Sequence, residues 1–527
     1  MTEKRKPYFL RPATGLIREA GGLDILSMAV LNCSIGMGIF WLILWGPYLF
    51  PGGDLVLGTL ITFAFAIFGS LTWALLASVF PRSGGDYIFN SRILHPAIGF
   101  LTSTGWVVAN FIWCAILAAY VADPGLSVFF ALLGNSEAAA FMASPEGIIL
   151  VGTILIVFEC ALLIRSFKSY LWFQTATFIV AMVSLIVTLA LVMPINRADF
   201  ISAFNTYSAE YGSPNYSTII SLNTEIINPG FTWAATLALL PVAYWSVGYQ
   251  YFSAFIAGET KKVSRNMLVG IVGATVLCGL FMAFAAWLFI EKMGYDFLLS
   301  IAVVWDYGLG YNLPVGPYFN LFSGMLTTNV AILAFVGLGL ALWNLVYPAL
   351  SLVGQSRIAL AWAFDRLMPS WLGDVSDRFH TPVKNLIFFA VCGEIILILF
   401  ATELGLLGSY SPIIIQSLTT FLLTAIAAIV LPFRKKVKDI YEASPVSKYK
   451  IGSVPFISIC GVIYVILEIL VVYYFVKAPG LGAWHVPSLV ITAIILAASV
   501  VYFYAIRAYR KSQGIDIDLA FEELPPE

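Results

Sequence analysis

Two apolar segments interrupted by glycine hold the strongest candidates for chemistry in this chain. The first covers residues 34–40 (SIGMGIF) and the second covers residues 240–248 (LPVAYWSVG). A glycine weakens a helix by about 1 kcal/mol relative to alanine, and Pro241 removes a backbone donor. We therefore expect the chain to leave helical geometry at Gly36 and Gly38. Freed amides suit a carboxylate and freed carbonyls suit an ammonium group or a cation, so the pattern indicates binding of a small zwitterion.

Close helix packing is the other explanation for Gly36 and Gly38, because small residues line the contacts between membrane helices. On the first segment alone, packing is the stronger interpretation. The second interrupted segment changes this balance in favour of a binding site, since two such segments at corresponding positions are typical of transporters.

Other reactive side chains are scattered along the chain. The six cysteines and three histidines have no spacing typical of a metal site or a disulfide framework. Glu159, Glu394 and Glu468 lie within apolar segments, where a carboxyl group is a functional candidate by default. None lies in an interrupted segment, so protonated carboxyls bonded to neighbouring helices are favoured. No residue identifies a coupling ion, and the sequence predicts neither an enzyme nor a cofactor.

The composition indicates an integral membrane protein in contact with lipid. Of 527 residues, 60% are hydrophobic and 11% are charged, with a mean hydropathy of +0.91. A soluble domain averages about 25% charged residues. The formal net charge of -1 provides no basic field for nucleic acid. The basic, polar start of the chain predicts a retained N-terminus rather than a signal peptide.

Twelve segments are long and apolar enough to cross a bilayer, which takes about 20 residues each. They cover residues 24–49, 55–80, 97–121, 147–164, 169–193, 231–257, 266–290, 325–353, 382–400, 411–432, 454–476 and 485–507. Trp362 is expected in the linker that follows the eighth segment.

Basic residues fix the orientation of these segments. With both termini in the cytoplasm, every lysine and arginine lies on the cytoplasmic side except Arg197, Lys292 and Lys477. A missed or additional early segment would destroy this alternation. The sequence therefore predicts a multi-pass protein of the cell membrane with both termini cytoplasmic.

The two interrupted segments are the first and the sixth, and five crossings separate their starts. Since five is odd, the second set of five begins on the opposite face, as an inverted repeat requires. The expected parts are a cytoplasmic N-terminus, a first repeat, an extracellular loop, a second repeat, a basic loop, helices 11 and 12 and a cytoplasmic C-terminus. They cover residues 1–23, 24–193, 194–230, 231–432, 433–453, 454–507 and 508–527.

These motifs resemble the amino acid-polyamine-organocation (APC) family of transporters. Residues 35–40 resemble its first-helix glycine signature, and residues 81–87 (PRSGGDY) resemble the loop after its second helix. The resemblance continues over roughly residues 24–460, through residues 258–262 (GETKK), 356–361 (SRIALA), 365–369 (DRLMP), 381–382 (TP) and 431–434 (LPFR).

The resemblance implies an all-α membrane fold with twelve helices, a five-plus-five inverted repeat, broken helices 1 and 6, and two further C-terminal helices. It implies that the substrate meets the backbone of both broken helices. Trp245 is the expected aromatic lid, with Tyr244 as the alternative, and Asn110 lines the site or else bonds a neighbouring helix. The implied substrate-binding residues are Ile35, Gly36, Met37, Gly38, Asn110, Tyr244, Trp245, Ser246, Val247 and Gly248.

The sequence thus predicts a secondary active transporter that moves an amino acid or a related amine by alternating access. A proton or a sodium ion is the expected coupling ion. The alternative is a transporter-like amino acid sensor, or a channel, without concentrative flux. A membrane enzyme would need paired titratable groups or metal ligands facing one cavity, and the sequence offers none.

Overall fold

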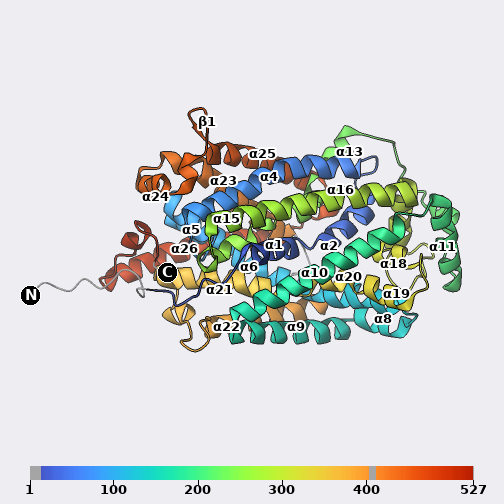
Figure 1. The fold of residues 1–527 in the computed structure, drawn as a ribbon, viewed down its shortest axis with the longest axis horizontal. Coiled ribbons are helices and arrows are strands. Elements are labelled where there is room, and N and C mark those ends of the chain that lie inside the picture. The colour runs from blue at the N-terminus through green and yellow to red at the C-terminus, as the bar shows by residue number, and fades with distance from the viewer. Residues whose placement is uncertain (1–12, 403–410, 526–527) are drawn as a thin grey trace, which may run out of the picture.

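The computed structural model describes residues 13–402 and 411–525 as one bundle of long helices (Figure 1). The two ends of the described chain, at residues 13 and 525, lie at one end of the bundle (the left in Figure 1), which we call the terminal end. The helices α8 (Ser136–Ala143), α11 (Arg197–Glu210) and α18 (Phe319–Gly324) lie at the other end, which we call the distal end.

Among the described residues, eleven helical stretches are long and apolar enough to span a membrane. Six of them are single helices: α4 (Leu55–Val79), α9 (Pro145–Arg165), α10 (Phe167–Val192), α22 (Val383–Ala401), α25 (Phe456–Lys477) and α26 (Val486–Ser512). The other five are interrupted or extended. They are Gly22–Leu49, Pro96–Leu132 with α6 (Pro96–Tyr120), Val263–Met293 with α16 (Gly273–Met293), Val330–Phe364, and Ile414–Phe433 with α23 (Ser411–Val430).

The sixth predicted segment is absent from these eleven because it consists of short pieces. It contains α13 (Trp233–Ala238), α14 (Leu240–Val247) and the 3-10 helix η3 (Gln250–Glu259). The eighth differs in its bounds from the predicted 325–353. It contains α19 (Val330–Gly337), α20 (Gly339–Asn344) and α21 (Tyr347–Phe364), so Trp362 lies inside a helix and not in the predicted linker.

Shorter elements connect these stretches at the two ends. They include α5 (Asp86–Ile93), α12 (Tyr216–Leu222), α17 (Tyr295–Asp306), α24 (Lys438–Ala443) and the 3-10 helix η10 (Ile517–Phe521). The strands β1 (Lys450–Ile451) and β2 (Val454–Pro455) form an antiparallel hairpin.

Local sequence explains where several long helices begin. Asp54 precedes α4, and one of its carboxylate oxygens accepts hydrogen bonds from the amides of Val56 and Leu57, both at 2.9 Å. Ser144 and Ser166 cap α9 and α10 in the same way. These caps satisfy first-turn amides that have no partner within the helix.

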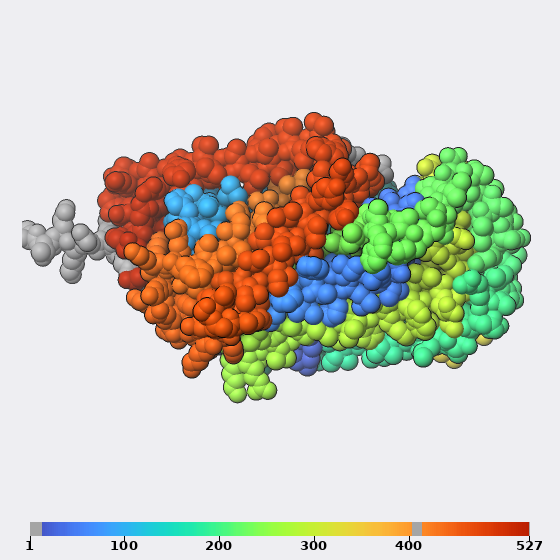
Figure 2. Space-filling model, turned by 90° about the horizontal axis from the view of Figure 1, so that it is seen from above, coloured from blue at the N-terminus to red at the C-terminus, as the bar shows by residue number. Residues whose placement is uncertain are grey.

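The first span is the centre of the bundle. In its most apolar part, 89% of the residues are buried inside the protein. The corresponding share for α26, which lies at the periphery, is 17%. One face of the molecule is covered by the orange and red C-terminal helices, with the blue α4 beside them (Figure 2). In Figure 1, α4 lies between α25 and α16. The first span is therefore enclosed by other helices along most of its length.

Candidate functional site

The first span is broken at a single residue. Helix α1 (Gly22–Cys33) ends before Ser34, which has left-handed backbone angles of φ 45° and ψ 70°, and α2 (Ile35–Phe40) begins after it. Residues 35–40 are helical, so the prediction that the chain leaves helical geometry at Gly36 and Gly38 is wrong. The break lies at the start of the predicted motif instead. After α2, the chain continues through the π-helical turn η1 (Trp41–Trp45) into α3 (Gly46–Leu49).

The two glycines allow close packing. A Cβ atom on Gly36 would lie 2.2 Å from Cδ1 of Trp343, and one on Gly38 would lie 1.8 Å from the hydroxyl oxygen of Ser246. Neither distance is compatible with a side chain unless the neighbour moves. The packing explanation that the sequence left open therefore applies to both positions, whatever else their backbone binds.

The sixth segment is interrupted after Val247. The α-helix α14 ends there, Gly248 and Tyr249 follow outside it, and the chain continues as the 3-10 helix η3. Pro241 lies in the first turn of α14, where a missing amide costs nothing. The interruption lies at Gly248, where the ring of Tyr244 leaves no room for a Cβ atom.

Hydrogen bonds join the two interruptions. The hydroxyl of Ser246 donates to the carbonyl of Cys33 at 3.0 Å, and the side-chain amide of Asn32 donates to the carbonyl of Tyr249 at 2.7 Å. The hydroxyl of Ser34 donates to Asn344 in α20 at 3.0 Å. Backbone carbonyls at both breaks thus accept bonds from the opposite helix, so residues from three spans meet at one buried point.

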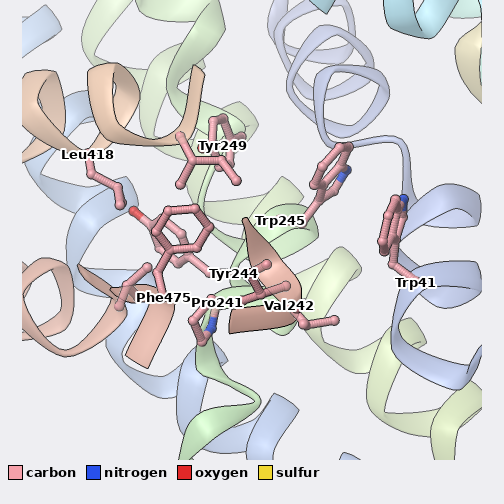
Figure 3. Close-up of a pocket in the computed structure, with 12 residues that line it drawn as sticks. Trp41, Pro241, Val242, Tyr244, Trp245, Tyr249, Leu418 and Phe475 are labelled. Atoms are coloured by element: carbon pink, nitrogen blue, oxygen red, sulfur yellow. The ribbon is translucent and has the colours of Figure 1, made fainter. Parts of the chain in front are cut away.

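A cavity of about 110 Å³ lies beside this point (Figure 3). Figure 3 shows Trp41 and Trp245 on one side of it and Leu418 and Phe475 on the other. Its lining comes from η1, α14, α23, α25 and the segment after α25, and consists of Trp41, Pro241, Val242, Tyr244, Trp245, Tyr249, Ile414, Leu418, Val471, Phe475, Gly480 and Leu481. No lining residue carries a formal charge.

The two lid candidates lie in different surroundings. Trp245 stacks on Trp41 with ring centroids 5.9 Å apart, and it meets Trp113 of α6 edge-on at 4.7 Å. Tyr244 instead donates its hydroxyl hydrogen to Glu468 of α25. Trp245 therefore contacts rings of η1 and α6, whereas the ring of Tyr244 contacts Tyr249 and Phe421 of α23. Local sequence patterns did not indicate that Trp41 and Trp113 would contact Trp245.

The remaining predicted site residues lie in the same buried region. Ile35, Met37 and Val247 are fully buried in α2 and α14. Asn110 is buried in α6, where its side-chain amide donates to the carbonyl of Trp106 in its own helix at 2.9 Å. Its carbonyl oxygen has no partner among the described residues.

Two buried ion pairs at the terminal end were not predicted. Arg357 of α21 forms two parallel bonds to Glu259 of η3, at 2.8 and 2.7 Å. The carbonyl of Glu259 also accepts bonds from the amides of Glu19 and Ala20, ahead of α1. The pair therefore ties the sixth segment to the eighth span and to the start of the first.

The second pair joins α5 to the residue after α21. Arg92 donates to both carboxylate oxygens of Asp365, at 2.7 and 2.8 Å, and the Tyr87 hydroxyl donates to the same carboxylate at 2.5 Å. The ring of Phe521 lies 5.0 Å from the Arg92 guanidinium carbon. The sequence motifs that resemble the family contain Glu259, Arg357 and Asp365, but the sequence does not indicate which residues these charged side chains pair with.

Comparison with known proteins identifies the family. The family model described as "Amino acid permease" matches residues 24–505. The chain belongs to the amino acid permease family. This match confirms the resemblance to APC transporters. It also identifies the chain as a multi-pass membrane protein of amino acid transport.

Relatives of this permease are distant and extend over most of its length. It is 25% identical over 470 residues to the branched-chain amino acid permease BcaP of Bacillus subtilis, covering 86% of this chain and 88% of that protein. It is 24% identical over 404 residues to the vacuolar cationic amino acid transporter 4 of Arabidopsis thaliana, covering 71% and 57% of the two chains. An uncharacterized transporter of Mycobacterium tuberculosis is 24% identical over 399 residues, covering 76% and 77%. All three are named as permeases or transporters, and none as an enzyme.

The described part of the permease holds no group of three or more histidine, cysteine or acidic side chains that could bind a metal ion. The candidate site is therefore made of backbone groups, aromatic rings and apolar side chains.

Proposed function

We propose that this permease is a secondary active transporter that moves an amino acid across the cell membrane by alternating access. One observation carries the proposal: Ser246 joins the sixth segment to the broken end of α1, beside a cavity. Transporters of this architecture bind substrate where interrupted helices leave backbone groups free.

The two ends of the zwitterion fit different parts of the site. The first amides of a helix have no partner within it, so those of Ile35, Gly36 and Met37 suit the carboxylate. Carbonyls at the ends of α1 and α14 suit the ammonium group. Gly38, Asn110, Trp245, Ser246, Val247 and Gly248 would complete the walls.

The cavity favours an uncharged, apolar side chain. Val242, Leu418 and Val471 line it, and none of its described lining residues is a carboxylate that would pair with a lysine or arginine substrate. The name of the Bacillus relative, a branched-chain amino acid permease, agrees with this preference. We therefore place aliphatic amino acids first among candidate substrates.

We further propose twelve crossings, made of two five-helix inverted repeats and two additional helices, with both termini in the cytoplasm. An even number of crossings agrees with the position of both chain ends at the terminal end (Figure 1). The basic residues favour the cytoplasmic side for that end. In this orientation the two buried ion pairs close the cytoplasmic side.

Cysteine labelling tests this orientation. Glu210 of α11 and Lys436 are both exposed and lie at opposite ends of the bundle. We expect Glu210→Cys to react with a membrane-impermeant maleimide in intact cells, and Lys436→Cys to react only after the membrane is opened. The reverse pattern would contradict the topology.

Trp245→Ala should raise the substrate concentration at half-maximal uptake by about fivefold or more, because an aromatic contact in the site is worth about 1 kcal/mol or more. Trp172→Ala is the matched control, since Trp172 of α10 is 74% exposed and lies far from the site in sequence. The measurement is initial-rate uptake at equal amounts of folded protein. Equal kinetic constants for the two variants would contradict the lid assignment.

Uptake by purified protein in liposomes tests the function itself. Labelled leucine, valine and isoleucine are compared with arginine, glutamate and a diamine, under imposed proton or sodium gradients. We expect concentrative uptake of the aliphatic amino acids. Binding without uptake would indicate a sensor, and flux that never exceeds equilibration would indicate a channel.

A further inference from the structure

Glu468 is a buried carboxyl group one hydrogen bond away from the cavity. It lies in α25 and is fully buried. One of its oxygens accepts a hydrogen bond from Tyr244, and the other has no partner among the described residues. Tyr244 itself lines the cavity and belongs to α14, the half-helix that bears Trp245 and Ser246. The carboxyl group is thus connected directly to the element that forms the candidate site.

Among the described residues, no cation compensates this carboxyl group. The helices packed around it are α4, α23, α14 and α13, and their sequences contain one titratable side chain, that of Tyr244. On α25 the nearest titratable neighbour is Tyr464, whose hydroxyl oxygen lies 3.4 Å from that of Tyr244 and accepts from the Trp73 indole at 3.4 Å. Tyr249 lines the cavity on the other side of Tyr244. In the part of the chain that the structure describes, tyrosines are therefore the only titratable neighbours of Glu468, and a charged carboxyl there is costly without a counter-charge.

The other two membrane carboxyls have different contacts. Glu159 accepts a hydrogen bond from the amide of Ala349 at 2.6 Å and so caps the start of α21. Glu394 of α22 accepts from the hydroxyl of Thr153 in α9 at 2.6 Å. Neither bonds a residue of α14 or of the cavity. Glu468 alone among the three is placed to affect the candidate site.

We propose that Glu468 is a proton-binding site that couples substrate movement to proton movement through Tyr244. This inference rests on the proposed function. The ionised carboxylate holds the Tyr244 hydroxyl in a charge-assisted bond, which is about twice as strong as a neutral one. Protonation of the free oxygen weakens that bond and releases α14 from α25. Loss of the proton restores it, so one proton binds and one leaves in each cycle.

The test measures leucine uptake into proteoliposomes with and without an imposed pH gradient, acidic outside. In the wild-type protein, the gradient should increase leucine uptake by about tenfold, which lies within the usual range of coupling free energies. Glu468→Gln should lose this response and still exchange internal for external leucine at a rate near that of wild type. Glu394→Gln is the matched control, because its carboxyl also accepts one hydroxyl bond within the membrane, and it should keep the response.

A second variant covers the case in which Glu468→Gln does not fold. Tyr244→Phe keeps the carboxyl group and removes the bond, so it should shift the pH at half-maximal uptake. The alternative proton site is Asp86 at the terminal end. Burial raises the pKa of its carboxyl group to about 7. A response lost in Asp86→Asn but kept in Glu468→Gln would overturn the inference, as would wild-type uptake driven by sodium alone. Wild-type protein that transports no amino acid under any gradient would instead overturn the proposed function.

Discussion

Gly36→Val is expected to reduce amino acid binding by about 100-fold or more, the cost of displacing binding groups by roughly 1 Å. A Cβ atom at this position would lie 2.2 Å from the Trp343 indole, so α2 and α20 must separate. That shift moves the amides of residues 35–37 away from the carbonyl of Cys33 and from Ser246. The measurement is equilibrium binding of labelled leucine to purified protein whose thermal melt confirms folding.

Two further variants separate binding from packing at this glycine. Gly273→Ala is the control for adding a methyl group to a span, because its Cβ would meet Leu26 at an ordinary 3.4 Å. The pair Gly36→Ala with Trp343→Ala removes the overlap. If packing is the whole role, the pair should bind leucine normally. We expect it to recover folding but not full affinity, because the backbone at Gly36 also meets the substrate. Normal leucine binding by folded Gly36→Val would contradict the site assignment.

Arg357→Met is expected to cost about 3–5 kcal/mol of stability, because it leaves Glu259 buried without its partner. Glu259 also anchors the amides of Glu19 and Ala20, so the damage should reach the start of α1. The expected observation is a markedly lower melting temperature in detergent and a higher rate of proteolysis near residue 20.

The double variant Arg357→Met with Glu259→Gln is the informative comparison. Removing both charges avoids the unpaired carboxylate, so the melting temperature should recover most of the loss. Lys384→Met is the control for an exposed pair, since Lys384 and Asp374 are 65% and 48% exposed, and it should change stability by less than about 1 kcal/mol. Equal losses in the single and double variants would show that Arg357 stabilises through Phe167, whose ring it covers at 4.9 Å, and not through charge.

The spans could be predicted from sequence because a bilayer imposes one requirement on every crossing. Backbone groups have no water to bond there, so each crossing is a run of about 20 apolar residues that can be read locally. The same pattern predicts a sixth crossing over residues 231–257, where the structure has only short helical pieces, so this crossing stays a prediction. The end of the eighth stretch was missed because α21 continues to Phe364 beyond the apolar run, as a buried helix containing Arg357.

The details of the site depend on contacts that sequence does not contain. Glycine is the usual residue for left-handed backbone, which favoured Gly36 and Gly38 as the break. Ser34 adopts that conformation instead, and its hydroxyl bonds Asn344, 310 residues away. Likewise Tyr244 and Glu468 are 224 residues apart, and Arg92 and Asp365 are 273 apart. Side-chain pairing at such separations follows from the assembled fold, so local patterns gave the residue types without their partners.

Substrate protection of a cysteine in the cavity tests the central claim most directly. Val242 lines the cavity on α14, and Cys392 is the one native cysteine that is not buried among the described residues, so Val242→Cys is made together with Cys392→Ala. A membrane-impermeant maleimide is added to proteoliposomes with and without the amino acid that is best transported. If the amino acid binds where the two broken helices meet, labelling at residue 242 should slow by at least about fivefold at saturation. Unchanged labelling at concentrations that saturate transport would contradict the account.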